Sequence, residues 1–302
     1  MILDMQRLLF TGGTGFLGKN IMPLLIRDYE VMTLGITERD ELKADLSKEI
    51  PDLPFQFDIV LHAAGKAHVY PKTEADRQVF YDVNYKGTVN LCRAFERWGL
   101  PKVMIFISTM NVYGSKPGNM DTEDSRPLVG DSPYADSKIK AEKFLVDWCK
   151  EYNVCLGILR PGLLAGVDAP GNLGAMVRGI RSGAYLSIDR GKAKKSLLMA
   201  EDIARLVPLV AKKGGVYNVC DSYNPSFGEL EGLIARQLGK RPPVSIPYWI
   251  AKCLACVGDV FTFFPINSSR LSKIVTSDTY SNKNAREELG WEPLDVLKYY
   301  KI

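Results

Sequence analysis

The sequence predicts an α/β fold, a doubly wound parallel sheet with a smaller C-terminal α/β lobe. Short apolar runs alternate with longer stretches of helical period as far as Arg160. A glycine-rich turn directly follows the first apolar run and opens the first helical stretch. The chain has 302 residues, 46% of them hydrophobic and 25% charged, so it can bury a large core without a disulfide or a metal.

The predicted elements follow from these patterns in chain order. Each strand is a short run of apolar residues, as in a sheet buried on both faces. Strands are expected over 7–10, 30–34, 58–62, 103–108, 155–159 and 215–219. Helices are expected over 16–27, 74–98 and 133–151, where apolar residues recur every three or four positions. Right-handed crossovers between parallel strands make such a sheet doubly wound.

Glycine and proline become frequent after Gly162, and the helical pattern becomes less regular. We therefore expect residues 1–165 and 196–224 to form a first domain. Residues 166–195 and 225–302 would form the smaller lobe, with a ligand site in the cleft between the two.

Charge and cysteine content exclude several classes of protein. Lys and Arg number 39 and Asp and Glu 35, a net charge of +4, and the only basic run is 192–195, so a nucleic-acid partner is not expected. Cys253 and Cys256 form a single CxxC pair, which we interpret as part of a packed helix face and not as a metal site. Reduced, buried thiols are typical of a cytoplasmic protein.

Neither a leader nor a membrane span is expected. Asp4, Gln6 and Arg7 interrupt the first apolar stretch, so it does not resemble a signal peptide. The most apolar window, 249–264, is too short to span a bilayer. It is either a surface helix that touches a membrane or, as we favour, a core helix or pocket wall.

The glycine-rich turn, 11–18 (TGGTGFLG), is the first candidate binding site. Gly12 permits the tight turn, Gly15 allows a pyrophosphate to approach the backbone, and Gly18 allows the helix to pack on the strand. The N-terminus of the helix offers free N–H groups to the phosphates. Gly35 stands where this pattern expects a carboxylate for the adenosine ribose. With Thr37 and Arg39 nearby, this favours NADP, and NAD stays open.

Tyr134 and Lys138 are the first candidate catalytic pair. They lie four apart in a stretch that begins like a helix, with Ser132 as N-cap and Pro133 in the first turn. A tyrosine has an ordinary pKa of about 10, and a nearby ammonium favours its phenolate. We therefore expect Tyr134 to act as a general acid or base.

Two hydroxyl groups, those of Ser108 and Thr109, lie at the carboxyl end of the strand expected at 103–108. Ligands of open α/β sheets bind at such strand ends. A hydroxyl at this place can hold a substrate oxygen while Tyr134 transfers a proton.

Together, the segments TGGTGFLG, HAAG (62–65), STMNVYG (108–114), YADSK (134–138) and RPG (160–162), with Asn84, resemble the extended short-chain dehydrogenases/reductases. The resemblance is closest to the NAD-dependent epimerase/dehydratase family, which acts on nucleotide sugars, and it covers about the whole chain. It implies a Rossmann domain with NAD or NADP, a substrate lobe for a nucleotide sugar, and a homodimer formed by the Tyr134 helix and the long helix before it.

The resemblance also implies roles for individual residues. Thr109, Tyr134 and Lys138 would be catalytic, with Ser108 as the substitute for Thr109. Asn172 and Lys195 would bind the sugar diphosphate, and Arg270 is a further candidate. The residues expected to bind the cofactor are Gly12, Thr14, Gly15, Phe16, Leu17, Gly18, Asp45, Leu46, Ala63, Ala64, Gly65, Asn84, Tyr134, Lys138 and Pro161. His62 would lie near the cofactor without catalysing, and His68 in a loop at the surface or the pocket.

Two departures from the family pattern narrow the activity. The family's dehydratases carry an acidic pair after the threonine, where this chain has Met110 and Asn111, so elimination of water is not expected. Lys195 stands where an arginine is usual, which keeps the charge without the bidentate fork.

We therefore expect an oxidoreductase that acts at C4 of a UDP-sugar, either an epimerase or a 4-ketoreductase, in the synthesis of surface-polysaccharide precursors. Two alternatives remain. One is a reductase of steroid- or phenolic-type ketones. The other is a non-catalytic NADP sensor on the same fold.

Overall fold

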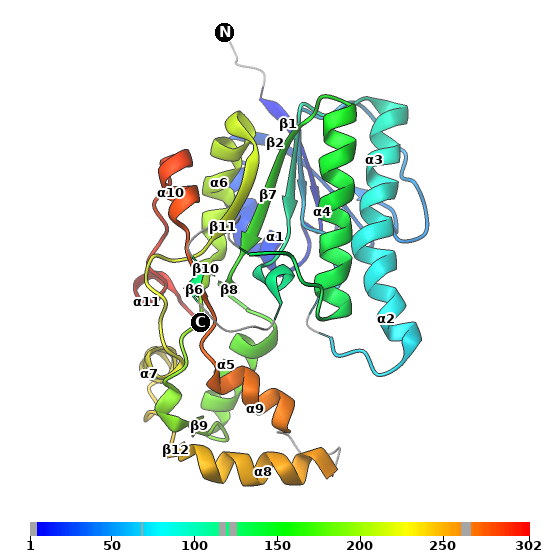
Figure 1. Ribbon diagram of the computed structural model, residues 1–302. Coiled ribbons are helices and arrows are strands. Elements are labelled where there is room, and N and C mark those ends of the chain that lie inside the picture. The colour runs from blue at the N-terminus through cyan, green and yellow to red at the C-terminus, as the bar shows by residue number, and fades with distance from the viewer. Residues whose placement is uncertain (1–4, 68, 115–118, 121–125, 261–266) are drawn as a thin grey trace.

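The computed structural model describes residues 5–67, 69–114, 119–120, 126–260 and 267–302. At positions 119, 120, 260, 269, 270 and 273 it describes the backbone alone. Figure 1 shows a sheet between two layers of helices, and a second group of short elements around α5, α7, α8 and α9 beneath it.

The main sheet has seven parallel strands in the order β11-β7-β5-β4-β1-β2-β3. These are β1 (Gln6–Thr11), β2 (Tyr29–Gly35), β3 (Leu42–Lys43), β4 (Ile59–His62), β5 (Val103–Ile107), β7 (Cys155–Pro161) and β11 (Gly215–Val219). All six strands predicted from the sequence are present, because each is an apolar run buried on both faces. The strand order reverses between β1 and β4, and the carboxyl ends of these two strands open the crevice where such sheets bind ligands.

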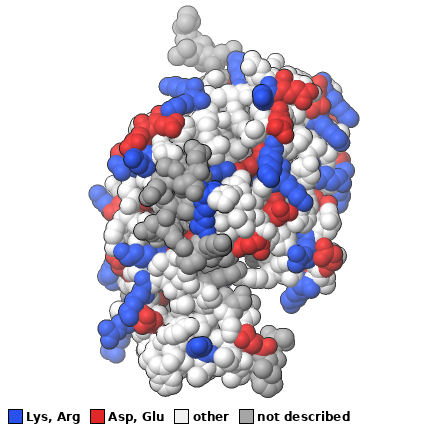
Figure 2. Space-filling model, in the orientation of Figure 1, with Lys and Arg blue, Asp and Glu red and all other residues white. Residues whose placement is uncertain are grey.

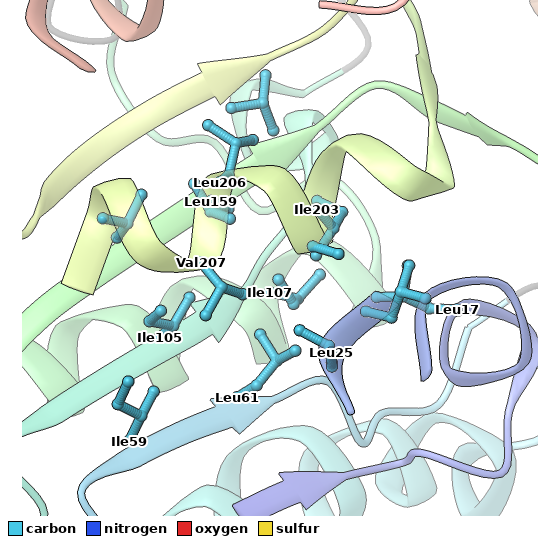
Figure 3. Close-up of a cluster of buried hydrophobic side chains, with 14 of the residues drawn as sticks. Leu17, Leu25, Ile59, Leu61, Ile105, Ile107, Leu159, Ile203, Leu206 and Val207 are labelled. Atoms are coloured by element: carbon cyan, nitrogen blue, oxygen red, sulfur yellow. The ribbon is translucent and has the colours of Figure 1, made fainter. Parts of the chain in front are cut away.

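Helices cover both faces of the sheet. On one face lie α1 (Phe16–Leu25) and α6 (Ala200–Lys213), which contact each other. Their apolar side chains meet those of the strands in a buried cluster that includes Leu17, Leu61, Ile105, Ile203 and Val207 (Figure 3). On the other face, α3 (Gly87–Trp98) and α4 (Pro133–Glu151) pack over Leu9, Val60 and Phe106. The doubly wound sheet predicted from the sequence is confirmed.

The long helix expected over 74–98 is interrupted. This stretch consists of α2 (Glu74–Phe80), a π-helical turn (Tyr81–Lys86) and α3. Helical periodicity does not distinguish an α-turn from a π-turn, so the sequence pattern continued across the break. A π-turn widens the helix by one residue and often marks a functional site. This one contains Asn84, which is buried.

The remaining elements pair in small sheets beside the main one. β8 (Leu163–Ala165) pairs with β10 (Leu197–Met199), β9 (Ser187–Ile188) with β12 (Ser245–Ile246), and β6 (Asn119–Met120) with β13 (Thr279–Tyr280). The helices of this region are α5 (Gly171–Ser182), α7 (Phe227–Gln237), α8 (Tyr248–Val260), α9 (Ser268–Val275), α10 (Lys283–Leu289) and α11 (Val296–Tyr299). The turns Met110–Tyr113 and Asp189–Gly191 are 3₁₀-helical.

Helix α8 corrects one prediction. Cys253 and Cys256 are exposed and do not form a packed face. The helix instead buries Ala251 and Ala255 against Leu271, so the cysteines fall on its outer side. Trp249 is 66% exposed on the same helix. Among the residues that the structure describes, no helix is long and apolar enough to cross a membrane.

Charges of both signs are interspersed over the face seen in Figure 2. The lower part, around α8, carries few charged side chains in this view.

Candidate active site

A cavity of about 2020 Å³ runs along the carboxyl ends of the strands and on between the sheet and α5, α8 and α9. It joins segments that lie far apart in the sequence. The predicted site residues that line it are Gly12, Thr14, Gly15, Phe16, Leu17, Asp45, Leu46, Ala63, Ala64, Gly65, Thr109, Tyr134, Lys138, Pro161, Asn172 and Lys195. The cavity is the candidate active site.

The glycine turn at one end of the cavity fits a dinucleotide. Gly12 has a φ of +76°, and a Cβ there would lie 2.9 Å from the backbone of Ala64. Gly15 is the N-cap of α1, and no side chain caps this helix. The first N–H groups of α1 are therefore free to bind phosphate oxygens. Gly18 lies outside the cavity, where its missing side chain permits contact with Gly13.

The loop after β4 forms the cavity wall beside the glycine turn. Asn84 fixes this loop with two hydrogen bonds, because it accepts from Lys66 N at 2.7 Å and donates to Lys66 O at 3.1 Å. It also donates to Ser137 Oγ on α4 at 2.9 Å. Asn84 does not line the cavity. It shapes the surface that Gly65 and Lys66 present there.

Asp45 lies in the cavity wall beyond β3. It pairs with Lys48 at 2.8 Å, and it accepts from the Ser47 hydroxyl at 2.6 Å. These contacts lower the pKa of Asp45, chiefly through Lys48. Asp45 is therefore a carboxylate at neutral pH, held in place at the rim of the cofactor site.

The structure separates the roles of the two candidate hydroxyls. Ser108 also lines the cavity, but its hydroxyl donates to the buried carboxylate of Glu142. Thr109 lines the cavity, its oxygen accepts from Asn111 N at 3.2 Å, and its side chain hydrogen-bonds to Tyr134. Thr109 is therefore the hydroxyl next to the general acid–base candidate.

Burial dominates the pKa of both members of the Tyr134–Lys138 pair. Lys138 lies beneath the loop after β4, close to Gly65. Its Nζ donates to Ile107 O at 2.7 Å and lies 4.2 Å from the centre of the Phe106 ring. Desolvation lowers the pKa of Lys138 to about 7. Desolvation also raises the pKa of Tyr134, although the Thr109 hydrogen bond opposes the shift. The expectation of a lowered tyrosine pKa is thus wrong for the protein alone, because burial of the Tyr134 hydroxyl disfavours its phenolate.

A buried ion pair anchors α4, the helix that carries Tyr134 and Lys138. Arg160 donates to both carboxylate oxygens of Glu142, at 3.1 and 2.6 Å, and to the Tyr113 hydroxyl at 2.9 Å. Glu142 lies one turn after Lys138 on α4, and its charge opposes the fall in the lysine pKa. The fork geometry satisfies both carboxylate oxygens, as a buried charge requires.

The other end of the cavity combines positive charge with polar groups. Asn172 lies at the start of α5, a helix with no side-chain cap and no acid in its first turn. Lys195 projects from the segment before β10, with Asp278 Oδ2 at 3.9 Å from its ammonium. Sequence reasoning missed Asp278 and Tyr280, which also line the cavity, because no local motif marks them. The side chain of Arg270 and all of His68 lie outside the described residues.

The model of one protein family, the NAD dependent epimerase/dehydratase family, matches residues 8–220. This span holds the glycine turn, the β4 loop and the Thr109–Tyr134–Lys138 set. The chain belongs to the NAD-dependent epimerase/dehydratase family. It is accordingly an NAD(P)-dependent enzyme of the short-chain dehydrogenase/reductase type.

Named relatives within the epimerase/dehydratase family differ in their reactions. The chain is 28% identical to a UDP-glucose 4-epimerase of Vibrio cholerae, over 97% of this chain and 92% of that protein. It is 26% identical to a GDP-6-deoxy-D-mannose reductase of Pseudomonas aeruginosa, over 76% and 79%. A solved structure of the UDP-glucose 4-epimerase of Thermus thermophilus with NAD superposes with a TM-score of 0.71, at 23% identity over 95% and 94%. This last similarity shows the shared fold.

His62 ties together three segments of this epimerase/dehydratase site. Its Nδ1 lies 2.6 Å from the Thr11 hydroxyl and its Nε2 2.9 Å from the Thr88 hydroxyl. Thr88 donates its own proton to Asn84 O at 2.7 Å, so its oxygen accepts from Nε2–H. Nδ1 then accepts from Thr11, whose oxygen receives Ala64 N–H at 3.1 Å. One polarised chain thus runs from the cofactor loop to the π-turn, and it requires a neutral imidazole.

This chain of hydrogen bonds makes stability sensitive to acid. Burial lowers the pKa of His62 from 6.5 to about 3, so the unfolded chain binds a proton below pH 6.5 while the folded protein does not. The contribution is complete above pH 6.5 and is lost as pH falls toward 3. We expect His62→Gln to reduce the change in unfolding free energy between pH 7.5 and 5.5 by about 1.4 kcal/mol. Urea denaturation of both proteins at the two pH values measures it, and an equal pH dependence would contradict it.

Proposed function

We propose that the protein is a nucleotide-sugar oxidoreductase that acts at C4 of the sugar, as a 4-epimerase or a 4-ketoreductase. The observation that carries the proposal is one cavity lined by two sets of residues. The first set, Thr109, Tyr134 and Lys138, is suited to proton transfer. The second set, Asn172 and Lys195, is suited to binding a diphosphate. The relative named UDP-glucose 4-epimerase supports the C4 position, and the relative named GDP-6-deoxy-D-mannose reductase supports reduction of a nucleotide sugar.

The residues of this chain handle the proton, and a bound nicotinamide supplies or accepts the hydride. In reduction, the Tyr134 hydroxyl donates its proton to the oxygen of a 4-keto group. In epimerisation, the Tyr134 phenolate first accepts the proton of the C4 hydroxyl. It returns that proton to the same oxygen after the 4-keto sugar has turned over and presented its other face for reduction. The Thr109 hydroxyl orients the oxygen on C4. The Lys138 ammonium, when protonated, lies near Tyr134 and favours its phenolate. The raised pKa of Tyr134 keeps it protonated at neutral pH, the form that reduction requires.

The site argues against three alternatives. Elimination of water would need acidic side chains at positions 110 and 111. Met110 and Asn111 line the cavity there, and neither side chain transfers a proton at neutral pH. A steroid- or phenolic-type ketone carries no anionic group that Asn172 and Lys195 could bind. A non-catalytic sensor would have no use for the Tyr134–Thr109 contact.

We further propose the substrate class, the assembly and the division of the chain between cofactor and sugar nucleotide. The sugar is UDP-linked and serves the synthesis of surface-polysaccharide precursors in the cytoplasm. The enzyme works as a homodimer with NAD or NADP. Residues 1–165 and 196–224 hold the cofactor, and residues 166–195 and 225–302 hold the sugar nucleotide.

Nicotinamide absorbance tests the reaction directly. Purified protein is mixed with NADH or NADPH and a panel of UDP- and GDP-sugars and their 4-keto forms. Stoichiometric consumption of the reduced cofactor with a keto sugar identifies a ketoreductase. Inversion at C4 without a net change in absorbance identifies an epimerase. If no sugar nucleotide binds, the proposal fails and a non-nucleotide ketone becomes the better substrate.

A further inference from the structure

The end of β2 contains a carboxylate that the sequence pattern did not locate. Gly35 is the last residue of β2 and lines the cavity beside Thr14 of the glycine turn. A Cβ built on Gly35 would lie 2.5 Å from Asp40 Oδ2 and 2.9 Å from Asp40 Oδ1. The carboxylate of Asp40 therefore occupies the space into which a side chain at position 35 would extend.

The loop after β2 holds this carboxylate in place. Thr37 donates to Asp40 Oδ2 twice, from its backbone N–H at 3.0 Å and from its hydroxyl at 2.8 Å. The Thr14 hydroxyl approaches the same oxygen at 3.4 Å. Asp40 is only 8% exposed, although residues 36–39 of the loop are exposed. The loop thus folds back and inserts one acid under the edge of the cavity.

The second oxygen of Asp40 lacks a donor. Asp40 Oδ1 is buried and has no hydrogen-bond partner among the residues that the structure describes. A buried carboxylate oxygen without a donor is costly, and such groups in native proteins commonly await a ligand or a water. Asp40 does not itself line the cavity, but Thr14 and Gly35, which its carboxylate approaches, line it at the glycine turn that fits a dinucleotide.

We infer that Asp40 reads the 2′ position of the adenosine ribose and makes the enzyme prefer NAD to NADP, an inference that rests on the nicotinamide cofactor of the proposed function. A ribose hydroxyl donates to Oδ1 and completes its hydrogen bonding. A 2′-phosphate brings a negative charge against a fixed carboxylate and has no proton to offer.

The lysines near this loop are paired with other carboxylates, so the exposed Arg39 is the cation that a 2′-phosphate could still contact. The Thr37 hydroxyl, a candidate phosphate donor by sequence, is committed to Asp40. Lys43 pairs with Glu38, and Lys48 pairs with Asp45. The absence of an acid at Gly35 favoured NADP when the end of β2 was considered by itself. The structure places a carboxylate there from Asp40, five residues farther along the chain.

Equilibrium binding without any sugar tests the inference. Dissociation constants of NADH and NADPH are measured by nucleotide fluorescence, and those of 5′-AMP and adenosine 2′,5′-bisphosphate by calorimetry. We expect the native protein to favour NADH and 5′-AMP by about tenfold or more, and Asp40→Asn to remove most of that preference. Asparagine keeps an acceptor for Thr37, so the loop can keep its conformation.

Glu38→Gln is the matched control, since it removes the same charge from the same loop at a side chain that is 86% exposed. Equal or tighter binding of NADPH by the native protein would overturn the inference, as would an Asp40→Asn shift no larger than that of Glu38→Gln. Loss of both cofactors in Asp40→Asn, with an unchanged melting temperature, would also overturn it, since Asp40 would then bind the nucleotide without selecting between the two. Because no sugar is present, these outcomes do not depend on whether C4 is the reacting carbon.

Discussion

Replacing Tyr134 by Phe is expected to lower turnover of the nucleotide sugar about 10²- to 10⁴-fold, the usual contribution of a positioned acid or base. The change removes only the hydroxyl that Thr109 contacts and leaves the ring that packs beside Phe80. Dissociation constants of NADH and NADPH should stay the same, because the glycine turn and the β4 loop are untouched. Steady-state rates and cofactor fluorescence provide the two measurements.

Tyr152→Phe is the matched control for this prediction. Tyr152 is the C-cap of the same helix, α4, and does not line the cavity. Its variant should turn over like the native enzyme. Full activity of Tyr134→Phe would eliminate Tyr134 as the acid–base group and with it the proposed reaction chemistry.

Replacing Gly18 by Ala is expected to destabilise the protein by about 3 kcal/mol, at the upper end of overpacking effects. Alanine is normally favoured over glycine inside a helix. At this position its Cβ would lie 1.8 Å from Gly13 O and 2.3 Å from Gly13 C. Backbone atoms of the glycine turn must therefore move, and we expect cofactor binding to weaken as well. Urea denaturation and NADH titration measure the two effects.

Gly232→Ala separates this clash from the general effect of the substitution. Gly232 lies inside α7, and its nearest neighbour would be Arg236 Nη1 at 3.5 Å, an ordinary contact. This variant should be as stable as the native protein or up to about 1 kcal/mol more stable. If Gly18→Ala behaved in the same way, the close packing of α1 on the glycine turn would be refuted.

The sequence alone predicted the parts of the protein that are encoded locally. The glycine turn follows directly from the spacing of Gly12, Gly15 and Gly18 after an apolar strand. Helix α4 begins at Pro133 and ends at Glu151, as its N-cap and periodicity indicate. Tyr134 and Lys138 share a face for the same reason, since four residues make about one turn. Neighbours in the chain determine each of these features.

Contacts between distant segments decided the rest. Ser108 and Thr109 are adjacent in sequence, and only the buried Glu142 shows that Ser108 is structural. The pKa of Tyr134 rises because several elements remove it from water, an effect that the local charge pattern did not contain. Cys253 and Cys256 face outward because α8 presents its alanines to Leu271.

Asp40 is the sharpest case of this division. Sequence spacing placed the ribose-facing position at Gly35 and found no acid there. The structure fills the same space with a carboxylate from the following loop, held by Thr37. Local spacing determines which backbone positions border the cofactor, because strand and turn geometry are regular. The side chain that fills the space beside these backbone positions depends on how the loop after β2 folds back. Only the tertiary structure determines this.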